Sequence, residues 1–252
     1  MISRDLTLQR TLPKLLALAL GLGGGYAALA VGTPIKVIND QSKLATVNIS
    51  YNSGASYANS LAGAIKMDVN QSGGGGIYAG DPEIFWTYCL DVAPSLYLGT
   101  TYHFEAKPFP DPKDPPPAPG WVVGGIYRAA YLFNTEHDLW DAVPPADKKH
   151  AAALQLAIWE CLYDTELNLT AGTFQVGTST DNDIELYAQQ YLNAVSDAIA
   201  DNSFVIYTTT WLDPDENTQS LLYRPVPDGG STLAMLGLGF LGMAGLMRRN
   251  RN

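Results

Sequence analysis

Cys89 and Gln155 are the residues whose types and settings could support chemistry. Gln155 stands in the middle of an apolar run, residues 154–160, whose spacing predicts a buried helix. A buried amide costs several kcal/mol unless it finds hydrogen-bond partners, so Gln155 is either a hydrogen-bonding strut or a reactive group. Cys89 lies in a strand-like aromatic segment, residues 86–91. The chain must bring that strand against the helix if the two residues act together.

These two segments resemble the thioester domains of bacterial surface adhesins. The resemblance is carried by Tyr-Cys-Leu at 88–90 and Leu-Gln-Leu-Ala-Ile-Trp at 154–159, within a body of residues 46–207. It implies that the Cys89 thiol attacks the Gln155 amide, ammonia leaves, and an internal thioester forms. An amine on a partner surface can then displace the sulfur and leave a stable amide, since a thiolate leaves more readily than ammonia. The resemblance also gives shielding or packing roles to the neighbouring motif residues Tyr88, Ala157, Ile158 and Trp159.

The sequence departs from this family pattern at two points. Leu154 stands where many thioester domains have threonine, and a second cysteine, Cys161, follows the glutamine. Two cysteines in an exported protein often form a disulfide. However, Cys161 lies six residues after Gln155, about 240° around a helix, so the two side chains point in different directions. A thioester, a Cys89–Cys161 disulfide and two inert packed thiols therefore remain open.

Two further acidic patterns have possible chemical roles. Glu160 and Asp164 are spaced i, i+4, which places two carboxylates side by side on a helix. Such a pair could hydrolyse glycosides or form a polar helix edge. Residues 213–217, Asp-Pro-Asp-Glu-Asn, could bind calcium through oxygen ligands but also fit a turn. The three histidines lack ligand spacing, and no glycine-rich loop precedes a helix. We therefore expect no metal and no cofactor.

Charge excludes one class of partner. Residues 31–226 contain 9 basic and 23 acidic side chains, so the net charge of this body is −14. Such a surface repels phosphate backbones and disfavours anionic lipid surfaces. We expect no nucleic acid partner.

The N-terminus has the pattern of a secretory signal peptide. Basic residues precede an apolar run at residues 15–22, and Ala-Leu-Ala at 28–30 matches the small-x-small pattern before a cleavage site. We therefore expect residues 1–30 to be a signal peptide and the mature chain to begin near Val31.

The C-terminus has three parts, predicted as one unit over residues 226–252. A polar motif comes first, and its residues are Val226, Pro227, Asp228, Gly229, Gly230, Ser231 and Thr232. An uncharged apolar segment from Leu233 to Met247 follows, and the basic residues Arg248, Arg249 and Arg251 come after it. The order predicts a transmembrane helix at 233–247 whose basic end stays in the cytoplasm. The tail resembles the PEP-CTERM sorting signal of Gram-negative bacteria, in its Val-Pro-Asp variant. That resemblance implies an exosortase as partner, insertion in the inner membrane before processing, and delivery to the cell surface or extracellular matrix.

The remaining residues, 31–225, predict one α+β domain. Alternating patterns at 46–51, 64–69, 83–90 and 97–105 predict a small antiparallel sheet. Helical spacing at 122–133, at 151–163 with Asp147 as cap, and at 183–200 predicts an inserted helical subdomain. Strands return at 203–211 and 220–223, and the proline-rich residues 107–120 predict a stiff loop. Strands, helices and strands in that order favour α+β.

The sequence thus predicts an exported surface protein that is not a turnover enzyme. The leading hypothesis is covalent attachment, through an internal thioester, to amines on another surface or matrix polymer. The alternative is a structural protein of the envelope or exopolysaccharide matrix, with a disulfide or free cysteines. A secreted hydrolase using the Glu160 and Asp164 carboxylates is the third hypothesis.

Overall fold

The computed structural model describes residues 33–69, 84–93, 95–108, 119–141, 148–200, 210–214 and 218–223. Within these ranges the chain is α+β, as predicted. The strands are β1 (Thr33–Val37), β2 (Leu44–Ser50), β3 (Ala58–Gly63), β4 (Ile65–Asp68), β5 (Ile84–Cys89), β6 (Thr101–Pro108), β7 (Gln175–Val176), β8 (Thr210–Pro214) and β9 (Leu221–Tyr223). The helices are α1 (Gly125–Asp141), α2 (Lys148–Tyr163) and α3 (Asn182–Ala200).

Several predicted segments fall outside the described residues. They are the signal peptide at 1–30, most of the proline-rich loop, the Asp147 cap, residues 203–209 of the predicted strand at 203–211, residues 215–217 of the acidic segment, and the sorting tail with its apolar segment at 233–247. In the part of the chain that is described, no helix combines the length and apolarity that crossing a membrane requires.

The strands form more sheet than the sequence predicts. Six of them close into an antiparallel barrel in the order β1-β4-β5-β9-β8-β6, and a second sheet has the order β3-β2-β7. Inward-facing side chains such as Ile35, Val37 and Met67 are buried in the barrel strands. β6 runs through Lys107 and Pro108, which pair with β8, so the strand extends two residues into the segment predicted to be a loop. Proline is acceptable there because it ends the strand.

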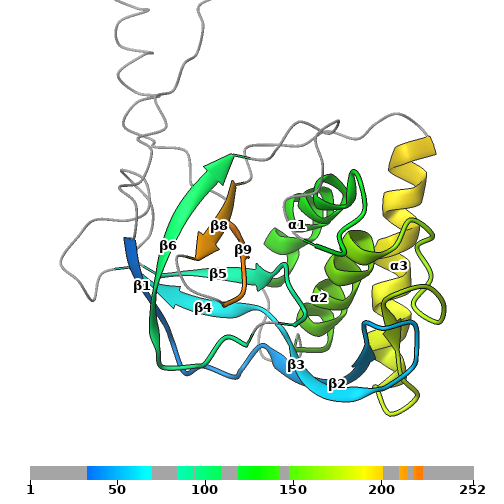
Figure 1. The fold of residues 1–252 in the computed structure, drawn as a ribbon, viewed down its shortest axis with the longest axis horizontal. Coiled ribbons are helices and arrows are strands. Elements are labelled where there is room, and N and C mark those ends of the chain that lie inside the picture. Colours follow the sequence, from blue (N-terminus) through cyan, green and yellow to red (C-terminus); the bar gives the residue numbers. More distant parts are fainter. Residues whose placement is uncertain are drawn as a thin grey trace, which may run out of the picture.

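Helix α2 is the centre of the helical layer (Figure 1). It packs between α1 and α3 and also contacts β2 and β3. Twelve consecutive residues, 151–162, are buried, which explains why this segment shows no polar face. The three helices come between β6 and β8 in the chain, and α3 buries a stripe that includes Ile184, Tyr191 and Val195, at the spacing predicted.

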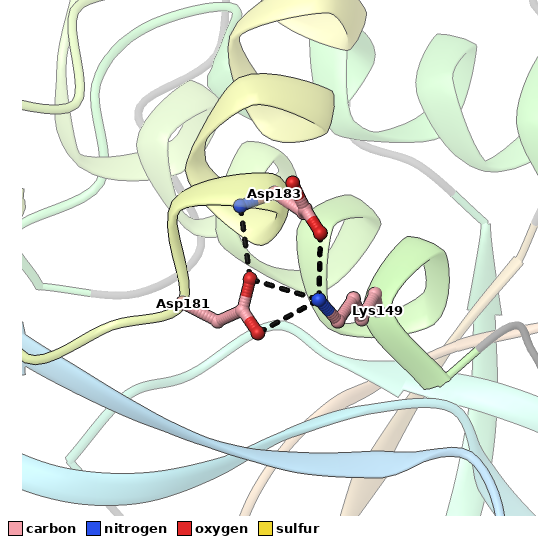
Figure 2. Close-up of polar contacts among 3 residues, drawn as sticks. All are labelled: Lys149, Asp181 and Asp183. Atoms are coloured by element: carbon pink, nitrogen blue, oxygen red, sulfur yellow. Dashed lines mark hydrogen bonds and ion pairs between the residues drawn. The ribbon is translucent and has the colours of Figure 1, made fainter.

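The N-terminal ends of α2 and α3 are joined by an ion-pair cluster (Figure 2). Lys149 of α2 lies 2.8 Å from the carboxylate of Asp181 and 2.7 Å from that of Asp183. Asp181 also caps α3 by accepting the Asp183 N–H at 2.9 Å. Because all three side chains reach solvent, the ion pairs add little stability; the cap is the larger contribution.

Gly63 marks the point where the chain leaves the β3 sheet and enters the barrel as β4. Its φ is +137°, and a Cβ built there would lie 2.0 Å from the Lys43 carbonyl oxygen. Backbone atoms cannot move aside cheaply, so only glycine fits. The abrupt change of direction also fixes where β4 begins, which matters at the site described below.

We expect Gly63→Ala to destabilise the fold by ~3 kcal/mol or more, since a positive φ and a backbone clash act together. Gly99→Ala is the matched control, because Gly99 has a φ of +82° and nothing within 4 Å of its Cβ position; it should cost only ~1 kcal/mol. Urea unfolding of both variants checks the difference. Equal losses would mean that the Lys43 contact does not matter.

Candidate functional site

The candidate site lies where strand β5 ends against helix α2. Cys89 is the last residue of β5 and is 4% exposed, and Gln155 of α2 is 1% exposed. The structure therefore brings these two predicted residues together although 66 positions separate them.

The Gln155 side chain binds the backbone of Cys89 rather than its sulfur. Its Oε1 accepts the Cys89 N–H at 2.9 Å, and its Nε2 donates to the Cys89 carbonyl at 2.7 Å. The neighbouring strand β4 starts at Ile65, which pairs with Thr87, so no β4 residue is left to pair with Cys89. The side-chain amide takes the place of the missing strand partner, and every polar group of this pair is satisfied.

The Cys89 sulfur instead faces a second glutamine, Gln219. The distance from Sγ to Gln219 Oε1 is 2.5 Å. This contact has the geometry of a hydrogen bond from the Cys89 thiol to the amide oxygen, and it places the sulfur beside the Gln219 side-chain amide. Gln219 is partly exposed, so its acyl carbon lies nearer solvent than that of Gln155.

Asp91, two residues after the end of β5, holds Gln219 in this position. The Gln219 Nε2 donates to the Asp91 carbonyl at 3.0 Å, and the Asp91 Oδ2 accepts the Ser220 N–H at 2.8 Å. These bonds also fix the amide orientation, because a flipped Gln219 would place two carbonyl oxygens against each other. The β5–β9 pairing of Cys89 with Leu221 brings the two segments into register.

The environment of Cys89 disfavours its thiolate. Burial is the main reason that the pKa of Cys89 lies far above its usual range, and the negative charge of Asp91 adds to the shift. A free thiol here is therefore protonated and a weak nucleophile toward solvent reagents. Any reaction of this sulfur therefore depends on a reacting group that the fold holds close to it.

Cys161 belongs to a different part of the core. It is fully buried, and burial raises its pKa to about 12. Its carbonyl oxygen accepts a hydrogen bond from Arg128 of α1 at 2.8 Å. Both cysteines are free thiols in this structure, so the disulfide alternative is not formed here.

The remaining motif residues support the site by packing. Tyr88, Ala157, Ile158 and Trp159 are all buried. The Tyr88 ring meets Phe133 of α1 edge-on, with centroids 5.9 Å apart, and Trp159 packs against Phe174 at 6.0 Å. These contacts hold β5 and α2 in the core.

Glu160 and Asp164 do not form an open carboxylate pair. Glu160 is fully buried and accepts the Asn168 N–H at 2.8 Å. The two Asp164 oxygens accept the N–H groups of Thr173 and Phe174 at 2.8 and 2.7 Å. Both carboxylates therefore anchor the loop after α2, and a buried loop anchor does not fit the role of a glycosidase pair. Among the described residues, no group of three or more potential ligands could hold a metal ion.

Glu160 should make stability depend on pH. Its Oε2 is buried without a partner, and burial is the main cause that raises its pKa from 4.5 to about 8. The folded state therefore keeps a proton that the unfolded chain loses, so stability should fall as pH rises from about 4.5 to about 8.

Glu160→Gln imitates the protonated acid and should remove most of this slope. We expect the variant to match the parent near pH 5 and to exceed it by on the order of 2–4 kcal/mol at pH 8.5. Urea unfolding at both values checks this, with Glu166→Gln, in the exposed loop, as control. A variant less stable than the parent at both values would show that the carboxylate is ionised in the fold.

Comparison with known protein families gives a match at the C-terminus of the chain. The family model described as the VPDSG-CTERM motif matches residues 225–250. The chain therefore has a PEP-CTERM-like sorting signal where the sequence predicts it. The motif indicates an exported, cell-surface-directed protein and is consistent with processing by a sorting enzyme such as an exosortase. No curated protein and no solved structure matches the chain.

Proposed function

We propose that the domain carries an internal thioester between Cys89 and Gln219 and uses it to attach covalently to amines on a partner surface or matrix polymer. The observation that carries the proposal is the 2.5 Å separation of the Cys89 sulfur from Gln219 Oε1. The predicted donor, Gln155, is replaced in this role because both of its amide atoms bind the Cys89 backbone.

The bond-forming step balances without a cofactor. The Cys89 sulfur attacks the Gln219 Cδ, the S–C bond forms, the C–N bond breaks, and ammonia leaves with the thiol proton. Proximity drives this step, since a protonated thiol is otherwise a poor nucleophile. Gln155 contributes by holding the Cys89 backbone, and Asp91 by holding the Gln219 amide.

The same burial explains how the bond survives until a partner arrives. Cys89 is only 4% exposed, so the sulfur side of the bond is shielded from attacking water. A thioester also removes the titratable thiol and leaves a neutral link whose sulfur is buried. The module reacts once and does not turn over, which is the behaviour of an attachment device rather than an enzyme.

Export and surface direction fit this use. The sorting signal sends the chain to the cell surface, where amines of other proteins or polymers are within reach. A structural role in the envelope or matrix without covalent chemistry is the alternative. The free thiols of Cys89 and Cys161 are the observation that favours it.

Intact mass spectrometry with methylamine separates the two functions. The full chain is purified in detergent, because its C-terminal apolar segment needs it. The thioester form should gain the mass of one methylamine and yield one additional thiol when the treated protein is unfolded and alkylated, whereas the Cys89→Ala variant should gain no methylamine. An unchanged mass of the parent protein would leave only the structural function.

A further inference from the structure

We propose that Asp91 forms the entry subsite for the attacking amine and selects a positively charged primary amine over a neutral nucleophile. This inference rests on the proposed thioester between Cys89 and Gln219. It concerns how the attacking amine reaches the thioester, which the proposed thioester alone does not specify.

The first argument follows the nitrogen that leaves. Before the bond forms, the Gln219 Nε2 donates to the Asp91 carbonyl at 3.0 Å. Ammonia departs from this position and takes with it the N–H group that donated to the Asp91 carbonyl. Attack by an amine is the reverse of ammonia loss, and by microscopic reversibility the entering nitrogen takes the same place. A primary amine can donate one N–H to the Asp91 carbonyl while its lone pair points at the acyl carbon.

The second argument concerns the negative charge of the Asp91 side chain. The Asp91 carboxylate is held by the Ser220 N–H at 2.8 Å, one residue after the acyl donor. It is close enough to Cys89 to disfavour the thiolate electrostatically. Asp91 is 9% exposed, so its field is little screened by water. An ammonium group entering the subsite therefore meets one fixed negative charge.

The Asp91 carboxylate can also accept the proton that the attacking amine must lose. An ammonium must lose a proton before its nitrogen can attack, and a nearby carboxylate can accept that proton. The free amine then forms the C–N bond, the C–S bond breaks, and the sulfur takes the second proton from nitrogen. Cys89 ends as a neutral thiol, and the carboxylate passes its proton to water. The products are an amide, a thiol and one released proton.

The test compares methylamine, which is an ammonium ion at pH 7, with hydroxylamine, which is neutral. Both are reacted with the full chain in detergent, and adduct formation is followed by intact mass. A small soluble thioester supplies the reference ratio of the two rates. The subsite should shift this ratio toward methylamine by about tenfold, the equivalent of ~1.4 kcal/mol. A ratio equal to that of the small thioester overturns the inference while leaving the thioester itself established.

Asp91→Asn assigns the effect to this residue. Asparagine keeps an oxygen for the Ser220 N–H, and the backbone carbonyl is unchanged. The variant should lose the tenfold preference for methylamine, so that its ratio of the two rates falls to that of the small thioester. Equal slowing of both rates would indicate only a structural role and contradict the inference. If the variant forms no thioester, the ratio measured on the parent protein still decides, and a failure of the parent to react with either reagent counts against the proposed function instead.

Discussion

Replacing Gln219 with alanine is expected to abolish the reaction with methylamine completely while leaving the domain folded. The variant removes the acyl carbon next to the Cys89 sulfur, so no thioester can form and Cys89 remains a thiol. Gln219 is only partly buried and precedes β9, so its loss should cost little stability. Intact mass before and after methylamine measures the effect, with circular dichroism to confirm folding.

A matched control is available on the outer surface of α3. Gln190 is exposed, and Gln190→Ala should react with methylamine as the parent does. Gln219→Glu is a second useful variant, because it preserves the side-chain shape but presents a carboxylate, which does not acylate a thiol. A Gln219→Ala protein that still takes up one methylamine would contradict the assignment of the acyl donor and return that role to Gln155.

Replacing Gln155 with leucine should have the largest effect on stability. The substitution leaves the Cys89 N–H and carbonyl without partners in a buried position, and each unsatisfied group costs roughly 1–3 kcal/mol. We expect a loss of roughly 2–5 kcal/mol in the free energy of unfolding. Loss of these two hydrogen bonds should also let the Cys89 backbone move. Thioester formation should then be impaired, because the sulfur would no longer be held against Gln219.

The stability measurement needs a background without the cross-link. Both Gln155→Leu and the control Gln190→Leu are therefore made in the Cys89→Ala variant, whose residue 89 backbone is unchanged. In that background the control should stay within about 0.5 kcal/mol of its parent. A Gln155→Leu loss no larger than the control's would show that the amide is not a strut for β5.

The sequence predicted the parts of this site that depend on local patterns. Helical spacing placed Gln155 inside a buried helix, and the need to satisfy a buried amide predicted either a strut or a reactive group. The structure favours the strut. Cys89 was also located from its strand-like segment. The sorting signal could be recognised because its polar, apolar and basic parts follow one another directly in the sequence, so no tertiary contact is needed to identify it.

The proposed acyl donor, Gln219, was not predicted, because no local pattern marks it. It stands 130 positions from Cys89 in a short segment before a three-residue strand. Only the β5–β9 register brings it to the sulfur, and a strand pairing over that separation cannot be read from periodicity. The best available signal was the position of Gln219 directly before the predicted strand at 220–223.

The barrel was not predicted, because long-range strand pairing cannot be read from the sequence pattern. Alternation predicts that a segment is a strand but not which strands are neighbours. β1, β3 and β7 were not predicted. β1 closely follows the expected signal peptide, β3 contains small residues at Ala58, Ser60 and Ala62 that give weak strand patterns, and β7 has only two residues. Closure of six strands into one barrel follows from pairings such as β1 with β6, which are distant in sequence.

The most direct test of the central claim is to locate the methylamine within the chain. The full-length protein is treated with methylamine, the freed thiol is alkylated, and the digested peptides are sequenced by tandem mass spectrometry. The account predicts N-methylated glutamine at Gln219 and alkylated Cys89, with Gln155 unmodified. Methylamine on Gln155, or an unmodified Gln219 in a protein whose Cys89 was alkylated before the amine was added, would contradict it.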